Sequence, residues 1–308
     1  MALLLCGLAL LPISMGALVT TLKAGMAFAD WPTSDGQNML LYPWLKDLAN
    51  PDKFTEHGHR LAGMLLGFSS ILFVVATFRM TSIRWARVYS IVILLSVIGQ
   101  GLLGGARVLM DRQLLAMLHS ITGAMFFCLC AGFVLFSSDH WKKVVYERDD
   151  SMTASSAIIV LVLPALVFAQ YILGSCFRHL HFLLYEHIGG AVLVTLASLI
   201  AIGSLRRSSV PSLNLAARLL MGSLHLQILL GLGAYATRLG IPWLGYVATS
   251  GSLAQAVVCS SHTVCGMFLL CSSTVSACLV ARLVQNGRIS SLSISRSAIP
   301  SIAEGDVA

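Results

Sequence analysis

Residues 56–78 read EHGHRLAGMLLGFSSILFVVATF, a stretch with charged and histidine residues (56–60) followed at once by an apolar run (61–78). A helix of about 20 apolar residues spans the ~30 Å hydrocarbon core of a bilayer. Ionisable residues at such a helix are costly to keep there unless they serve a function. The stretch therefore predicts a membrane-spanning helix with a functional site at its first turns.

The composition of the whole chain is typical of an all-α polytopic membrane protein. The 308 residues are 57% hydrophobic and 11% charged, and the mean hydropathy is +0.84. Helices satisfy their own backbone groups where water is absent. The first apolar run resembles a secretory signal but has no basic residues before it, so we interpret it as a span. We expect eight transmembrane helices, near residues 2–22, 60–78, 87–106, 115–136, 154–175, 185–204, 217–237 and 256–283.

The net charge of +7 comes from Lys and Arg in short segments between the apolar runs. That distribution is typical of membrane topology and argues against a nucleic-acid partner. Twelve basic residues fall on the side of the two termini and eight on the other, which favours cytoplasmic termini. No Arg/Ser-rich transit peptide precedes the first run, so we expect a multi-pass protein of a bacterial plasma membrane.

A short internal repeat divides the chain into two halves. The phrase Gln100-x-x-Leu-Gly104 recurs as Gln227-x-x-Leu-Gly231, and a third copy begins at Gln170. We expect two pseudo-repeated four-helix bundles, residues 1–138 and 154–285. A cytoplasmic linker (139–153) would join them, and a disordered cytoplasmic tail (286–308) would follow.

Four histidines share one position in this repeat, the first turns of the even-numbered helices. They are His59, His119, His187 and His262. Two imidazoles from two helices of a bundle can clamp the iron of a porphyrin, with glycines lining the slot. Histidines satisfied by lipid headgroups or water are one alternative. Zinc is another, but no helix offers a third ligand at close spacing. The haem sites would lie near the external face.

Three arginines follow the Gln-x-x-Leu-Gly phrases and would emerge at the external ends of odd-numbered helices. They are Arg107, Arg178 and Arg238. Arginine can hold a porphyrin propionate with two parallel hydrogen bonds. The alternative is that the side chains extend to lipid headgroups.

The halves differ beside their first histidine. The first half has Glu56-x-x-His59-Arg60, whereas the second has Glu186-His187-Ile188. Residues three apart share a helix face, and a carboxylate beside a porphyrin can move protons during an oxidation. Alternatively, Glu56 caps the N-terminus of its helix. The roles of His57 and Cys176 stay open.

The order and spacing of these residues resemble the haem A synthase family, membrane enzymes that oxidise haem O to haem A for terminal oxidases. The resemblance extends from the first span to the last. The matching phrases are GALVTT (16–21), Ala29-Asp30-Trp31-Pro32 with Gly36, Glu56-x-x-His59-Arg60, Gln100-Gly-Leu-Leu-Gly-Gly105, His119, His187, Gln227-x-x-Leu-Gly and His262. Each phrase alone is weak, but their order is specific.

The resemblance implies a site in each half. A haem b cofactor (iron protoporphyrin IX) would be ligated by His187 and His262, and the substrate haem O by His59 and His119. Glu56 falls on the family's catalytic glutamate. The implied reaction is two successive hydroxylations of one ring methyl, then loss of water to a formyl group, with haem b relaying electrons.

Two departures from the family limit what the resemblance carries over. The segment before His57 has no cysteine pair, and Ile188 replaces the arginine that often follows the second-half histidine, which leaves His181 as an alternative to His187. A non-catalytic di-haem b-type cytochrome and a haem-binding carrier are the competing functions. A haem O synthase, a membrane electron donor and a second copy of the chain are the candidate protein partners. The electron donor and the source of the formyl oxygen stay open.

Overall fold

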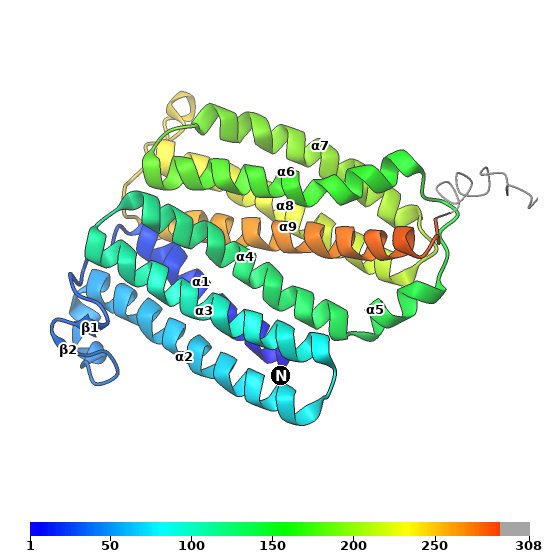
Figure 1. Ribbon diagram of the computed structural model, residues 1–308. Coiled ribbons are helices and arrows are strands. Elements are labelled where there is room, and N and C mark those ends of the chain that lie inside the picture. The colour runs from blue at the N-terminus through cyan, green and yellow to red at the C-terminus, as the bar shows by residue number, and fades with distance from the viewer. Residues whose placement is uncertain (290–308) are drawn as a thin grey trace, which may run out of the picture.

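Long helices side by side make up most of the protein, whose structure is a computed structural model describing residues 1–289 (Figure 1). Within these residues, eight helices are long and apolar enough to span a membrane, which confirms the predicted all-α polytopic class. They are α1 (Ala2–Thr21), α2 (Pro51–Met80), α3 (Arg84–Met110), α4 (Gln113–Ser137), α6 (Ala154–Leu180), α7 (Leu184–Arg207), α8 (Pro211–Leu239) and α9 (Leu253–Gln285).

The remaining elements are short and lie between the spans. They are the strands β1 (Thr33–Ser34) and β2 (Gln37–Asn38), the helix α5 (Asp139–Lys143) and the 3₁₀ turns η1 (Trp44–Ala49), η2 (Val144–Tyr146) and η3 (Pro242–Leu244). The strands pair antiparallel around Asp35 and Gly36, which both have positive φ. Asp-Gly is a preferred pair for such a tight hairpin.

The two halves pack in the same cyclic order. In the first half α1 contacts α2, α2 contacts α3, α3 contacts α4, and α4 returns to α1. In the second half α6, α7, α8 and α9 close a ring in the same way. The halves meet where α1 and α4 contact α9 and where α4 contacts α6. Each group of four helices thus closes on itself, and the two groups share one interface.

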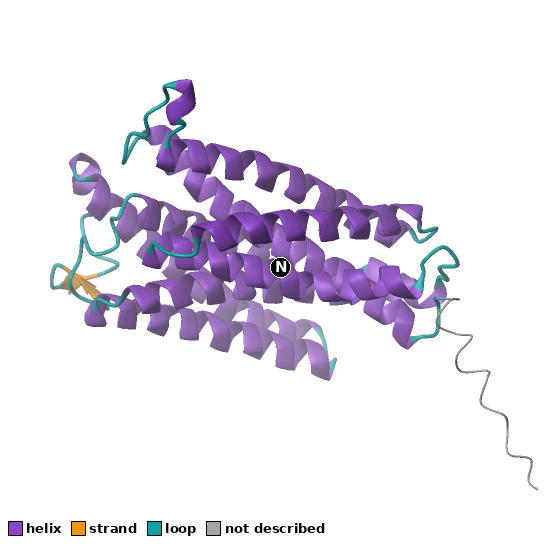
Figure 2. Ribbon diagram, turned by 90° about the horizontal axis from the view of Figure 1, so that it is seen from above, coloured by secondary structure: helices purple, strands orange, loops and turns teal. Residues whose placement is uncertain are grey.

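All four repeat histidines lie near the same end of the bundle. We call it the loop end, because the β1–β2 hairpin lies there, beyond the helices, in Figures 1 and 2. Helices α2, α4, α7 and α9 begin at the loop end, whereas α1 begins at the opposite end and α9 finishes there (Figure 1). The four histidines all fall within the first ten residues of these helices and therefore lie toward the loop end.

Helix α2 begins at Pro51, about two turns earlier than the sequence suggested. The Asn50 side chain accepts a hydrogen bond from the backbone N–H of Lys53, and proline suits the first helical position. Glu56 and His59 thus share one helix. The alternative that Glu56 caps the helix is wrong, because Asn50 does so.

The residues just after α9 are packed against the chain. The backbone N–H of Asp149 donates to the carbonyl of Arg288, and Ile289 is fully buried. Arg288 and Ile289, which the prediction placed in a disordered tail (286–308), are therefore packed against the rest of the protein. Residues 290–308 lie outside the described part of the chain.

Candidate functional site

The first-half histidines face each other across the bundle. The ring centroids of His59 on α2 and His119 on α4 are 6.0 Å apart, with an interplanar angle of 81°. His59 Nδ1 lies 2.8 Å from the carbonyl oxygen of Pro12. A carbonyl can only accept, so Nδ1 carries the proton and the Nε2 lone pair is free for a metal.

The second-half histidines repeat this arrangement. The ring centroids of His187 on α7 and His262 on α9 are 6.3 Å apart, with an interplanar angle of 86°. Gln170 Nε2 lies 3.0 Å from His187 Nδ1 and donates to the carbonyl of His187 at 2.7 Å. His187 rather than His181 is the residue whose ring faces His262.

Each imidazole lies against a glycine of the neighbouring helix. A Cβ on Gly16, Gly104, Gly174 or Gly231 would stand 3.0, 3.2, 2.8 or 3.1 Å from Cε1 of His59, His119, His187 or His262, respectively. Three of these glycines end a Gln-x-x-Leu-Gly phrase. The phrase therefore supplies the close approach that seats three of the four rings, since only glycine lacks the interfering Cβ.

Both pairs have the spacing that an iron between two imidazoles requires. Metal–imidazole bonds of roughly 2 Å on either side would hold the ring centroids roughly 6 Å apart. Within residues 1–289, no group of three or more His, Cys, Asp or Glu side chains comes together. Zinc needs three or four protein ligands, whereas a porphyrin supplies its own equatorial nitrogens. The donor sets fit haem and do not fit zinc.

A large cavity opens beside the first pair. Its volume is about 1160 Å³, and His59, His119 and Glu56 line it. Pockets for small molecules typically have ~300–1,000 Å³. The cavity extends to the second half, because Tyr171 and His179 of α6 also line it.

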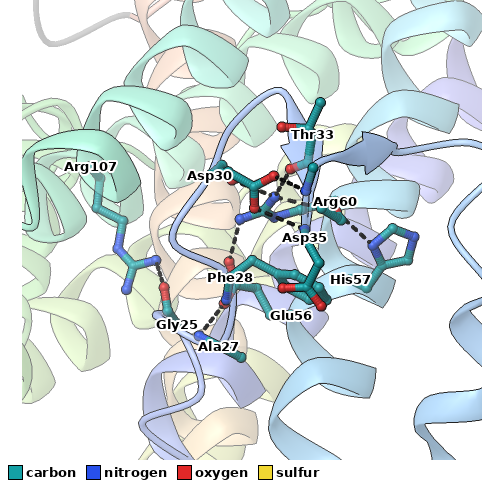
Figure 3. A network of polar contacts seen from close by, with 12 residues as sticks. Gly25, Ala27, Phe28, Asp30, Thr33, Asp35, Glu56, His57, Arg60 and Arg107 are labelled. Carbon is teal, nitrogen blue, oxygen red and sulfur yellow. Dashed lines mark hydrogen bonds and ion pairs between the residues drawn. The ribbon is translucent and has the colours of Figure 1, made fainter.

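Glu56 joins α2 to the segment that covers this cavity (Figure 3). Its Oε1 lies 2.7 Å from Arg60 Nη2, and its Oε2 accepts from the backbone N–H of Ala27 at 2.8 Å and of Phe28 at 3.3 Å. We call residues 24–38 the covering segment. Both oxygens of Glu56 are thus occupied by the protein itself.

Arg60 also binds the covering segment, through its other terminal nitrogen, Nη1. Arg60 Nη1 donates to the carbonyl oxygens of Asp30 at 2.9 Å and Thr33 at 2.7 Å. The Asp30 carboxylate accepts from the backbone N–H groups of Asp35 and Gly36. Burial raises the pKa of Asp30, but hydrogen bonds from Thr33, Gly36 and Asp35 outweigh it, and the pKa lies below its ordinary value.

His57 packs beneath this segment. It is fully buried among the rings of Phe28, Tyr42 and Trp44, and its Nδ1 lies 3.1 Å from Ser34 Oγ. The sequence left His57 without a role. In the structure it joins the segment before α2 to the helix.

The three predicted arginines all line the first cavity. Arg107 donates to the carbonyl of Gly25. Arg178 donates to the hydroxyl groups of Thr263 and Thr21, and Arg238 Nη2 lies 3.4 Å from His181 Nδ1. Arg178 and Arg238 belong to the second half, so their presence beside the first pair could not be derived from the repeat.

Two buried residues of α6 gain surroundings that the sequence did not predict. Cys176 lies against Met117 of α4, with its Sγ 3.8 Å from the Met117 sulfur. His179 is buried, and its Nε2 has no hydrogen-bond partner among the described residues. Neither residue has a counterpart in the other half of the repeat. Such counterparts are what identified His59, His119, His187 and His262.

Residues 46–187 match the family model COX15-CtaA, described as cytochrome oxidase assembly protein. The match runs from η1 to the first turn of α7 and includes Glu56, His59, His119 and His187. No curated protein and no solved structure matches the chain.

Proposed function

Because residues 46–187 belong to the COX15-CtaA family of cytochrome oxidase assembly proteins, we propose that this chain is a haem A synthase. It oxidises one ring methyl of haem O to a formyl group, which gives haem A for a terminal oxidase. The main observation in support of this proposal is that the two imidazole pairs match. Their ring centroids are 6.0 Å apart in the first half and 6.3 Å apart in the second.

The cavity beside the first pair supports assigning the substrate to that pair. His59 and His119 line the space of about 1160 Å³ and would hold the iron of haem O, a porphyrin with a long isoprenoid chain. His187 and His262 would hold haem b. When bound, haem b supplies one-electron redox chemistry. Gly174 of α6 lies against the His187 ring and seats it.

Glu56 would take part in proton movement at the cavity wall. One of its oxygens must first exchange a bond to Arg60 or to the backbone of Ala27 and Phe28. Substrate entry beneath the covering segment is the event that could bring about this exchange. A carboxylate at this position can accept or donate a proton during the methyl oxidation.

The same bonds favour a second candidate function. If Glu56 serves only to hold the covering segment, the protein is a di-haem b-type cytochrome or a haem-binding carrier without chemistry. A structural role accounts for both oxygens of Glu56, because each is satisfied within the protein.

The proposed setting is a bacterial plasma membrane, with both termini in the cytoplasm and the loop end outside. The excess of basic residues on the side of the termini supports this orientation. A haem O synthase that delivers substrate, a membrane electron donor and a second copy of the chain are the proposed partners.

Pigment analysis of purified protein tests this proposal. We expect a low-spin bis-imidazole haem spectrum that disappears in His187→Ala and His262→Ala and persists in His225→Ala, whose side chain is exposed on α8. Cells that make haem O should yield haem A with the wild type and none with His59→Ala. Unchanged haem b in His187→Ala would overturn the cofactor site, and haem b without any haem A in the wild type would favour the cytochrome.

A further inference from the structure

His179 is a buried imidazole in the wall of the first cavity. Its side chain comes from α6 of the second half, and 8% of the residue is exposed. Its Nε2 is buried and has no hydrogen-bond partner among the described residues, although the residue lines a large open space. A buried polar nitrogen left unpaired is costly, so a ligand group that pairs with it gains binding free energy.

The lining around His179 is strongly basic. Among the described residues that line the cavity, six are Lys or Arg and two are acidic. One of the two acids, Glu56, is already paired with Arg60. A surplus of positive charge at a low-dielectric wall attracts anions. The cavity therefore suits an amphipathic molecule with carboxylate groups.

Three arginines of the cavity wall are held by the protein, whereas Nε2 of His179 has no partner among the described residues. Arg107, Arg178 and Arg238 line the same cavity as the imidazole. Arg107 donates to Gly25, Arg178 to two threonines, and Arg238 lies against His181. They supply charge, and His179 supplies a directional group that no residue uses.

We propose that His179 Nε2 donates a hydrogen bond to a carboxylate of the molecule that fills the first cavity. The second half of the chain would then help to bind the substrate whose iron the first half holds. The identity of that molecule as a porphyrin dicarboxylate rests on the proposed function. Hydrogen bonds to charged acceptors are stronger than neutral ones, so a single donor can matter here.

Binding of iron-free protoporphyrin IX to the full-length protein in detergent tests this proposal, because it bypasses iron ligation. Porphyrin fluorescence gives the affinity. We expect His179→Leu to weaken binding about tenfold and His179→Gln, which keeps an N–H donor, to weaken it less than about threefold. His225→Leu, at an exposed position on α8, is the matched control and should bind like the wild type.

Comparison with the dimethyl ester of protoporphyrin distinguishes binding of the carboxylates from binding of the porphyrin ring. It should bind more weakly than the free acid to the wild type, and equally to the wild type and His179→Leu. If His179→Leu loses affinity equally for the acid and the ester, or loses no affinity for the acid, the role of His179 is overturned and the proposed function still stands. Absence of porphyrin binding by the wild type would overturn both. Displacement of the acid by equimolar oleate would assign the site to a lipid carboxylate and overturn the porphyrin role.

Discussion

Glu56 Oε1 lies 2.7 Å from Nη2 of Arg60, one turn further along α2, and both side chains are almost completely buried. Each partner also binds the covering segment, Glu56 through two backbone N–H groups and Arg60 through two carbonyls. The pair therefore connects the first cavity to the segment above it. Any substitution of Glu56 changes both stability and chemistry.

Glu56→Gln should destabilise the protein because it leaves the buried guanidinium of Arg60 without its counter-charge. Removing one partner of a buried ion pair costs about 3–5 kcal/mol. We expect a lower midpoint of thermal unfolding in detergent. Glu186→Gln, at the exposed glutamate of the other half, is the control and should leave the midpoint unchanged. Equal midpoints for Glu56→Gln and the wild type would contradict a structural role of the pair.

The double variant Glu56→Gln/Arg60→Gln separates the two roles of Glu56. Removing both charges should recover part of the stability that Glu56→Gln loses, since no unpaired charge remains. Mass spectrometry of extracted haems then reports the chemistry. If Glu56 moves protons, the double variant makes no haem A despite its recovered stability. Restored haem A would show that Glu56 matters through Arg60 alone.

Gly174→Ala should disturb the second imidazole pair. A Cβ there would stand 2.8 Å from Cε1 of His187, closer than real Cβ contacts, so the ring must move. We expect at least a severalfold loss of bound haem b or a changed low-spin absorption band. Gly222→Ala is the control, because a Cβ on that glycine of α8 meets no atom within 4 Å. Identical spectra for both variants would contradict the seating role of Gly174.

The class of the fold and the histidine pairs could be predicted from the sequence, because both depend on local or repeated signals. Long apolar runs define spans wherever they occur, and the recurring Gln-x-x-Leu-Gly phrase marked His59, His119, His187 and His262 as equivalent. In the structure the phrase contributes the glycine against which three of these rings lie. The repeat therefore has a packing reason in the structure, whereas the sequence alone showed only that the phrase recurs.

The contacts around Glu56 and Arg178 could not be predicted, since they depend on how distant segments meet. Glu56 and Arg60 lie in the second and third turns of α2 and bind residues of the covering segment that are about 30 positions away in the sequence. Arg178 reaches across the halves to Thr21 of α1. The repeat describes each half separately, so it carried no information on this interface.

Arg107→Gln should loosen the covering segment. The guanidinium of Arg107 on α3 donates to the carbonyl of Gly25, which anchors the start of the segment. We expect faster amide hydrogen exchange over residues 24–38 and no change in α9. Arg112→Gln, at the exposed residue just before α4, is the control. Unaltered exchange in Arg107→Gln would mean that Glu56 and Arg60 hold the segment without α3.

The hairpin in the covering segment should open in acid through Asp30. Its carboxylate accepts from the backbone N–H groups of Asp35 and Gly36, and its pKa in the folded protein lies below the ordinary value. The stability from a lowered pKa is complete above the ordinary value, about 3.9, and is lost as the pH falls through the folded value. Amide exchange at Asp35 and Gly36, corrected for its intrinsic pH dependence, should therefore accelerate only below about pH 4. Asp30→Asn should exchange faster at neutral pH and show no acid transition. An unchanged acid transition in that variant would assign it to another carboxylate.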